Sequence, residues 1–257
     1  MKRIRRQLIF AAGALAFWQM LAVLKLWPPY VFPTPAGVAE ALWAGYADGS
    51  LMIGIAVSMR RVAIGYAISV VLGTLLGVLF THHEFLDDTL GRFVLSLQSL
   101  PSICWLPVAV LWFGLNEKAI LFVAVAGSVL AVTQNTKAGF ENVPRILSMA
   151  GHNLGAKGPQ LFLHVTLPAS MPYLIDGWRQ GWAFAWRSLI SGEMIFVTLG
   201  LGQLLMVGRD LNDINQVFAV MIVIAAIGYC VEGVVFRKIE MSVRQKRGIA
   251  AAAFQKA

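Results

Sequence analysis

The chain is organised around the sequence MAGHNLGAKGPQLFLHVTLPASMP, residues 149–172. This segment is moderately polar and rich in glycine, and it lies between two long apolar runs. A helical pattern over residues 145–153 ends before Gly155, and a second apolar-periodic turn leads from Leu161 to Pro168. This order predicts a helix–turn–helix that lies at a membrane surface and fits into a groove on a partner.

The composition indicates that lipid is the natural solvent of most of the chain. Of the 257 residues, 58% are hydrophobic and 13% are charged. Soluble domains are about 45–50% apolar and about 25% charged, so this chain cannot cover its apolar side chains with polar ones. The first apolar run, Leu8–Trp27, is expected to be a retained span, because it is too long for a signal peptide and lacks a small-residue cleavage site.

The basic residues that give the chain its net charge of +8 are distributed as in a membrane protein. Basic residues cluster at the chain ends and in alternate loops, as orientation determinants do, so no nucleic-acid partner is expected. Cys104 and Cys230 both lie in apolar runs, and the four histidines lack the spacing of zinc ligands. We therefore expect neither a disulfide framework nor a metal site.

Six apolar runs predict an all-α membrane protein with six transmembrane helices and both termini in the cytoplasm. The runs are Leu8–Trp27, Leu51–Phe80, Phe93–Phe113, Ala119–Thr136, Tyr173–Thr198 and Val217–Phe236. They group into an N-terminal part, a core with a cytoplasmic loop, and a cytoplasmic tail. The expected bounds are 1–50 for the N-terminal part, 51–240 for the core, 137–172 for its loop and 241–257 for the tail.

Proline predicts two local features. Pro35 suits the first position of a short amphipathic helix on the outer surface, with Thr34 as its N-cap and Tyr46 near its end. Pro101 and Pro107 fall in one span and predict a bent or broken helix there.

Glycine predicts two more features. Gly65, Gly73 and Gly77 form a stripe of small residues that lets membrane helices approach closely. The glycine-rich segment 200–210 is expected to be a flexible outer loop.

The segment that begins at Met149 resembles the EAA cytoplasmic loop of ABC-importer permeases. The matching positions are Ala150, Gly151, Gly155, Ala156, Val165, Leu167 and Pro168. Met149 stands where the family has glutamate. The resemblance extends over most of residues 33–240 to the permeases for nitrate, taurine, aliphatic sulfonates and bicarbonate. It is carried by Ser58–Val62 with Gly65, Leu100-Pro101, Leu106-Pro107, Leu111–Gly114, Asn135-Thr136, Gly177–Arg179, Gly192-Glu193 and Gly200–Gly202.

This resemblance implies the membrane subunit of a type I ABC importer in the bacterial inner membrane. Such permeases pair as dimers, dock two ATPase subunits on the EAA loop, and accept solute from an extracytoplasmic binding protein. The chain has no G-x-x-x-x-G-K-[ST] phosphate loop. ATP and Mg²⁺ are therefore expected on a separate ATPase chain, and no cofactor is expected on this one. Whether the permease pair is a homodimer or a heterodimer stays open.

Charged residues in the membrane mark the candidate translocation pathway. Arg187 is expected to meet an anionic solute, with Trp182 and Trp186 shaping the passage beside the prolines of the third span, Pro101 and Pro107. A structural role also stays open, in which Arg187 pairs with an acid on another helix or caps a carbonyl freed by those prolines.

Three further charged residues lie near the outer side. Glu193 is interpreted as a structural or gate residue near the outer end of its span. Arg60 and Arg61 either attract anions at the outer mouth or extend to lipid headgroups.

Two other functional classes are less consistent with the sequence. A secondary transporter or channel that works without an ATPase should show an internal repeat and intramembrane acids, and no such repeat is seen. An intramembrane enzyme built on Gly127-Ser128 would lack an activating histidine within a span. The solute stays open: the resemblance points to sulfonates or taurine ahead of nitrate or bicarbonate, and similar permeases handle thiamine precursors.

Overall fold

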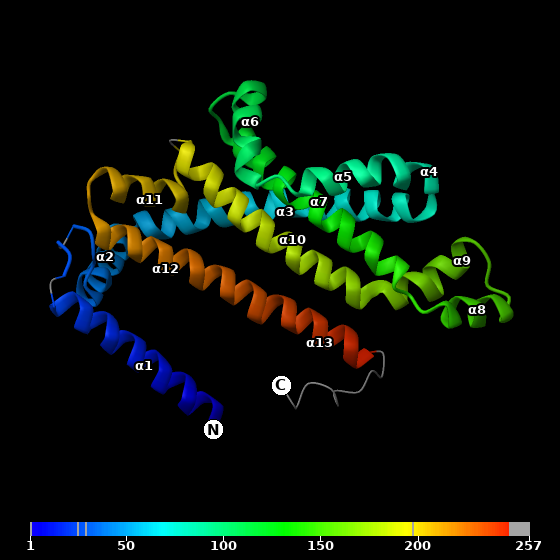
Figure 1. Cartoon of the computed structure of the whole chain (residues 1–257), viewed down its shortest axis with the longest axis horizontal. Coiled ribbons are helices and arrows are strands. Elements are labelled where there is room, and N and C mark those ends of the chain that lie inside the picture. The colour runs from blue at the N-terminus through cyan, green and yellow to red at the C-terminus, as the bar shows by residue number, and fades with distance from the viewer. Residues whose placement is uncertain (1, 25, 29, 197, 247–257) are drawn as a thin grey trace. The chain divides into compact units, whose positions relative to one another are not determined.

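The computed structural model describes residues 2–24, 26–28, 30–196 and 198–246, and every regular element in these residues is a helix. The chain divides into two compact units. The first comprises residues 1–59 and 193–226, and the second comprises residues 60–192 and 227–257. Figure 1 labels the helices in chain order.

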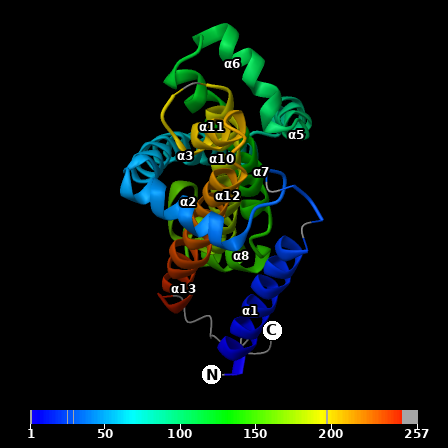
Figure 2. The ribbon, with the colours of Figure 1, turned by 90° about the vertical axis from the view of Figure 1, so that its left-hand side faces the viewer.

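The first unit combines the N-terminal helices with a later helical hairpin. Its elements are α1 (Lys2–Val23), α2 (Pro35–Ala47), the first turns of α3 (Ser50–His82), the end of α10 (Leu167–Ile195), α11 (Leu201–Asp210) and most of α12 (Ile214–Cys230). The Trp18 indole Nε1 donates a 3.0 Å hydrogen bond to the Pro33 carbonyl, which attaches α1 to the segment before α2. Helices α2 and α11 lie beside the start of α12 (Figures 1 and 2). Residues of all three helices line a cavity of about 300 Å³.

Helix α2 confirms the predicted short helix and its N-cap, while its place on the outer surface stays a prediction. It begins at Pro35, and the Thr34 hydroxyl accepts a 3.0 Å hydrogen bond from the Gly37 amide as an N-cap. The turn into α3 uses Gly49 at a φ of 78°, and the Ser50 amide bonds the Asp48 carboxylate at 2.8 Å. Hydrogen bonds from the Ser50 hydroxyl and amide hold the pKa of Asp48 below its ordinary value.

The second unit contains the glycine-rich segment of residues 149–172. Its elements are the rest of α3, α4 (Glu84–Leu86), the π-helical turn η1 (Asp87–Gly91), α5 (Arg92–Gln98), η2 (Ser102–Trp105), α6 (Leu106–Phe113), α7 (Glu117–Glu141), α8 (Arg145–Asn153), α9 (Pro159–Leu161), η3 (Phe162–Thr166), most of α10, the end of α12, η4 (Val231–Phe236) and α13 (Arg237–Lys246).

The proline-containing third span is broken, as predicted. The chain bends by 106° between helical residues 84–98 and helical residues 102–113. Pro101 is extended at the break, with φ −55° and ψ 136°, and Pro107 occupies the first turn of α6. A proline is tolerated in a first helical turn because the amide that it lacks would have no helical partner there. We refer to residues 99–102 as the elbow.

Several helices are apolar and long enough to cross a membrane. Within the described residues these are Ser50–His82, Glu117–Glu141 and Ile214–Val243, and the bent pair can serve as a fourth span. Ile9–Val23 in α1 is a shorter apolar helix. Helix α10 has the length of a span but is more polar, because it carries Asp176, Arg179, Arg187 and Glu193. The count of six spans stays a prediction.

The glycine stripe on α3 permits close approach of another helix, as predicted, and that helix is α7. An ideal Cβ at Gly65, Gly73 or Gly77 would lie 2.6–3.2 Å from a Cβ atom of α7. Real Cβ contacts are rarely this short, so the two backbones can be this close only because the three side chains are absent.

The expectation of a flexible loop over residues 200–210 is wrong, because Leu201–Asp210 forms helix α11. Its glycines permit close packing. A Cβ at Gly208 would lie 3.0 Å from Val217 Cγ2 and 3.3 Å from the Asp213 carbonyl. Glycine marks close backbone approach as well as loops, and the sequence alone did not distinguish these uses.

The helix that carries the expected fifth span starts before Tyr173. Helix α10 begins at Leu167 and continues through Pro172. Proline within a helix leaves a carbonyl without its amide partner, which membrane helices tolerate where other groups satisfy the freed backbone. The carbonyl freed by Pro172 is that of Pro168, and the Ser170 hydroxyl donates a 3.0 Å hydrogen bond to the neighbouring carbonyl of Leu167.

Candidate functional site

The end of α8 forms a sharp, well-defined corner. The Ala156 amide donates to the Gly151 carbonyl at 3.0 Å, and the Gly155 amide donates to the His152 carbonyl at 2.9 Å. This pair of bonds is the Schellman arrangement, which places the residue after the C-cap in the left-handed region. Gly155 occupies that position with a φ of 91°, where a side chain would be strained.

Gly151 brings α8 against the next helical segment. An ideal Cβ at this position would lie 2.7 Å from Leu161 Cδ1 and 2.9 Å from Val165 Cγ2. Gly151 is buried, and η3 follows α9 without interruption into α10. The predicted helix–turn–helix is therefore present, with α8 as its first helix and the continuous run from α9 into α10 as its second.

Large apolar side chains of α8 and of its C-cap residue are highly exposed. Ile146 is 73% exposed, Met149 is 65% exposed and Leu154 is 88% exposed. We name these three residues the α8 face. Ala150 is also exposed, whereas Ala156, Leu167 and Pro168 are half-buried. Several large exposed apolar side chains close together in the sequence of one corner are typical of a protein interaction site.

A cavity of about 310 Å³ lies where the elbow meets α7 and α10. Its walls come from α5, the elbow, η2, α7 and α10 of the second unit. The lining residues are Leu97, Gln98, Ser99, Leu100, Pro101, Ser102, Trp105, Ala126, Gly127, Leu130, Ala131, Phe184 and Arg187. Of these side chains, only that of Arg187 is charged.

The Arg187 side chain is held by its own helix. Its Nε donates a 2.9 Å hydrogen bond to the Ala183 carbonyl, and its Cζ lies 4.9 Å from the centre of the Phe184 ring. No ion pair of Arg187 is found within the described residues. The bonded carbonyl belongs to α10, so it is not one of those freed by the prolines of the third span.

The structure separates the other residues of the candidate pathway. Pro101 lines the cavity with Arg187, whereas Pro107 does not. Trp182 and Trp186 are buried away from the cavity lining, stacked with ring centres 6.1 Å apart. Tyr66 packs edge-on against Trp182 at 5.5 Å. These two tryptophans form interior packing of the second unit.

Glu193 lies in the first unit as part of a buried hydrogen-bond cluster. The Ser58 hydroxyl donates to Glu193 Oε2 at 2.6 Å and accepts from the Leu201 amide at 2.9 Å. The Gly202 amide donates to the same carboxylate oxygen at 3.1 Å. Glu193 and Ser58 therefore bind the first amides of α11, where a negative charge is favoured.

Arg60 and Arg61 are paired with an acid that the sequence argument did not connect to them. The Arg61 Nε lies 3.2 Å from Glu117 Oε1, and Arg60 bonds the same oxygen through Nη2. Arg61 is buried and Arg60 is largely exposed. The pairing attaches α3 to the first turn of α7.

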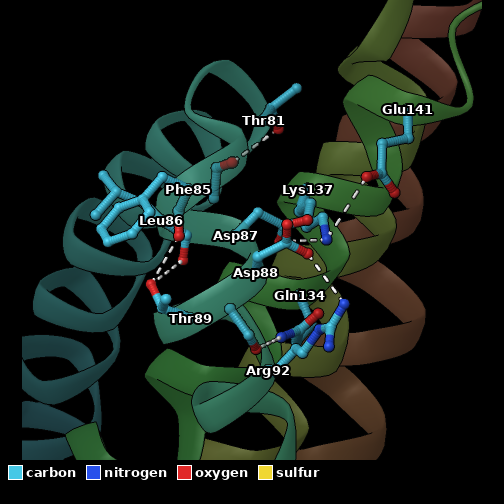
Figure 3. A network of polar contacts seen from close by, with 12 residues as sticks. Thr81, Phe85, Leu86, Asp87, Asp88, Thr89, Arg92, Gln134, Lys137 and Glu141 are labelled. Carbon is cyan, nitrogen blue, oxygen red and sulfur yellow. Dashed lines mark hydrogen bonds and ion pairs between the residues drawn. The ribbon is translucent and has the colours of Figure 1, made fainter.

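A second polar network, shown in Figure 3, fixes the π-helical turn η1 against α7. Lys137 bonds the Asp87 carboxylate and lies 3.6 Å from Glu141. The Gln134 side chain donates to the Gly91 carbonyl at 3.3 Å. Sequence reasoning missed this network because Lys137 and Asp87 are 50 residues apart. The only local signal was the acidic pair 87–88, followed four residues later by Arg92.

These features define the class of protein: a helical membrane component with a broken span, a cavity beside it and a sharp corner that exposes apolar side chains. The chain belongs to the family of binding-protein-dependent transport system inner membrane components, whose profile matches residues 69–238. It is accordingly a multi-pass component of the inner membrane. The permease subunits of this family are not themselves catalytic, and they work with a separate ATPase chain and a binding protein.

Individual relatives agree with this assignment. The putative aliphatic sulfonates transport permease protein SsuC of Escherichia coli is 31% identical over 216 residues, covering 84% of this chain and 82% of that protein. The riboflavin transport system permease protein RibX of Chloroflexus aurantiacus is 28% identical over 213 residues, covering 83% of this chain and 80% of that protein. A chain of a methionine ABC transporter solved in inward-facing conformations has a TM-score of 0.65 at 18% identity, covering 76% of this chain and 96% of that chain.

Proposed function

We propose that the chain is the membrane-spanning subunit of an ATP-driven importer for a small anionic solute. The candidate solutes are an aliphatic sulfonate or taurine, and then nitrate or bicarbonate. A binding protein outside the membrane delivers the solute, and two ATPase subunits drive its passage through a homodimer of this chain. The relative named for aliphatic sulfonates supports the first choice of solute.

The observation that carries this proposal is the corner built from α8 and η3. The Schellman bonds and the Gly151 contact make it rigid, while the α8 face leaves three apolar side chains exposed. A rigid element with an exposed apolar face can transmit the movement of a docked partner into the helices that follow it. Helix α10 follows directly and carries Arg187.

The proposed topology has six spans, with both termini and the α8 face in the cytoplasm. In this arrangement α1, α3, the broken pair α5–α6, α7, α10 and the helix from α12 to α13 each cross the bilayer. The α8 face then lies on the side where ATP is available, and nucleotide and Mg²⁺ bind to the ATPase partner. Pro101 and Arg187 line the solute pathway.

The Leu154→Asp substitution is expected to weaken retention of the ATPase subunit by about 10- to 100-fold. A charge would be placed in the centre of an apolar interface, where removal of one anchor typically costs about 2 kcal/mol or more. The measurement is the amount of ATPase subunit that copurifies with the tagged permease. ATP-driven uptake in proteoliposomes should fall in parallel.

The matched control is Leu115→Asp, because Leu115 is also an exposed leucine in a turn, 71% accessible, and lies before the first residue of α7. Under the proposed topology it is on the outer side and should leave ATPase retention unchanged. Equal loss of ATPase from both variants would contradict the docking assignment. Uptake by the purified permease without ATPase or ATP would instead identify a channel or secondary transporter.

A further inference from the structure

The cavity beside Arg187 combines one charge with apolar and aromatic walls. We infer that it is a solute subsite for an oxyanion that carries an uncharged apolar tail, such as a short alkanesulfonate. This inference rests on the proposed function, because it concerns the solute of the same importer, and it goes further by assigning the residues that hold each part of that solute.

The guanidinium of Arg187 is suited to the oxyanion. Within the described residues, Arg187 donates a hydrogen bond through Nε alone, to the Ala183 carbonyl. Both Nη groups therefore remain available as donors. Paired N–H donors on a planar cation match two oxygens of a sulfonate or carboxylate. A charged side chain in a membrane helix is costly without a counter-charge, so an arriving anion gains the interaction that the described chain does not supply.

The remaining lining residues are suited to an uncharged tail. Trp105 and Phe184 are aromatic, and the aliphatic part of the wall is formed by Leu97, Leu100 and Leu130. These side chains can bury the methylene groups of such a tail, which favours its binding. Nitrate and bicarbonate have no such groups and would leave this surface unused.

The lining also argues against a second charge on the solute. It contains no Asp or Glu, and its polar side chains other than Arg187 are Gln98, Ser99 and Ser102. The Ser99 hydroxyl is already bonded to the Ser96 carbonyl at 2.7 Å. An ammonium group such as that of taurine would therefore enter without a counter-ion.

The size of the cavity favours a small solute. Pockets for organic ligands span about 300–1,000 Å³, and the cavity of about 310 Å³ lies at the lower limit. A short alkanesulfonate is compatible with that volume. The Trp105 indole forms part of the wall, so its removal should lengthen the space available to the tail.

The test compares butanesulfonate, taurine and nitrate on the purified importer, reconstituted with its ATPase and binding protein. Calorimetric titration of the permease–ATPase complex measures binding, and proteoliposomes measure ATP-driven uptake. Wild-type protein should prefer butanesulfonate to taurine and nitrate. Arg187→Gln should weaken butanesulfonate binding and uptake by about 10- to 100-fold, because a hydrogen bond to a charged group is lost. Arg187→Lys should restore part of the loss.

Two further variants separate charge, size and folding. Arg179→Gln is the matched control, because Arg179 lies on the same helix, is paired with Asp176 at 3.1 Å and does not line the cavity. It should bind butanesulfonate like wild type. Trp105→Ala should shift the preference towards longer alkanesulfonates.

The outcomes distinguish this inference from the proposed function. Butanesulfonate binding that is unchanged in Arg187→Gln overturns the subsite, even if ATP-driven uptake is intact. Equal wild-type preference for taurine and butanesulfonate also overturns it. Binding that depends on Arg187 without any ATP-driven uptake supports the subsite and contradicts the proposed function instead.

Discussion

The Gly77→Leu substitution is expected to destabilise the protein by about 3 kcal/mol, the upper part of the range for overpacking a well-packed interior. A Cβ at Gly77 would lie 2.6 Å from the Thr136 Cβ and 2.7 Å from the Thr133 carbonyl oxygen. The second contact is with backbone, so a change of side-chain rotamer cannot relieve it, and α3 and α7 must separate. The measurement is thermal unfolding of the purified protein, followed by tryptophan fluorescence.

The control for this prediction adds bulk at an exposed position of the same helix. Leu75 is 62% accessible and lies two residues before Gly77, so Leu75→Phe should change the unfolding free energy by less than about 0.5 kcal/mol. Similar unfolding temperatures for the two variants would show that α3 and α7 do not depend on close approach at Gly77.

Features specified by neighbouring residues were predictable from the sequence. The bounds of α8 follow from an apolar pattern that ends before Gly155, and α2 begins where Thr34 and Pro35 provide a cap and a first turn. The break at the elbow follows from Pro101. In each case the signal and the structure that it specifies lie within a few residues of each other, so the local physical chemistry is sufficient.

Features that depend on distant partners were not predictable from one sequence. The glycines of α11 suggested a loop. The side chains that bind its first amides, Ser58 and Glu193, lie outside the helix, so the sequence of the segment did not reveal them. The sequence did not identify Glu117 as the partner of the two arginines on α3, because Glu117 lies 56 residues after Arg61. Apolar spacing could not decide whether Trp182 lines a passage or packs inside, since both roles give a stripe on one helical face.

For the candidate site, the sequence identified a charged residue but not its surroundings. Arg187, which is expected to meet an anionic solute, lines the cavity beside the elbow. The aromatic residues beside it are Trp105 and Phe184 rather than the two tryptophans of its own helix. Trp105 follows the elbow, and the direction of the chain after Pro101 cannot be read from the proline alone.

The second large effect is expected for Glu193→Ala, which should destabilise the protein by about 3 kcal/mol. The substitution removes the acceptor of the Gly202 amide and of the Ser58 hydroxyl. Glu193 and Ser58 are both fully buried, as are Phe196 and Leu201 nearby, so water cannot replace the lost acceptor without rearrangement. The start of α11 should then detach, which proteolysis or hydrogen exchange at residues 200–204 would detect.

A double-mutant cycle with Ser58→Ala provides the decisive measurement. Ser58 is bonded both to Glu193 and to the Leu201 amide, so the two substitutions remove members of one cluster. Residues in one hydrogen-bond network usually show coupling energies of about 0.5–3 kcal/mol, whereas independent sites are additive. A coupling of at least about 1 kcal/mol is therefore expected from the unfolding free energies.

Gly200 gives an independent test of the same cluster. A Cβ at this position would lie 2.5 Å from the Glu193 carboxyl carbon, so Gly200→Ala should be destabilising while Glu193 is present. In the Glu193→Ala background the obstructing carboxyl group is absent, and the same substitution should cost much less. Equal costs in the two backgrounds, together with additive effects in the Ser58 cycle, would show that Glu193 does not hold α11 in place.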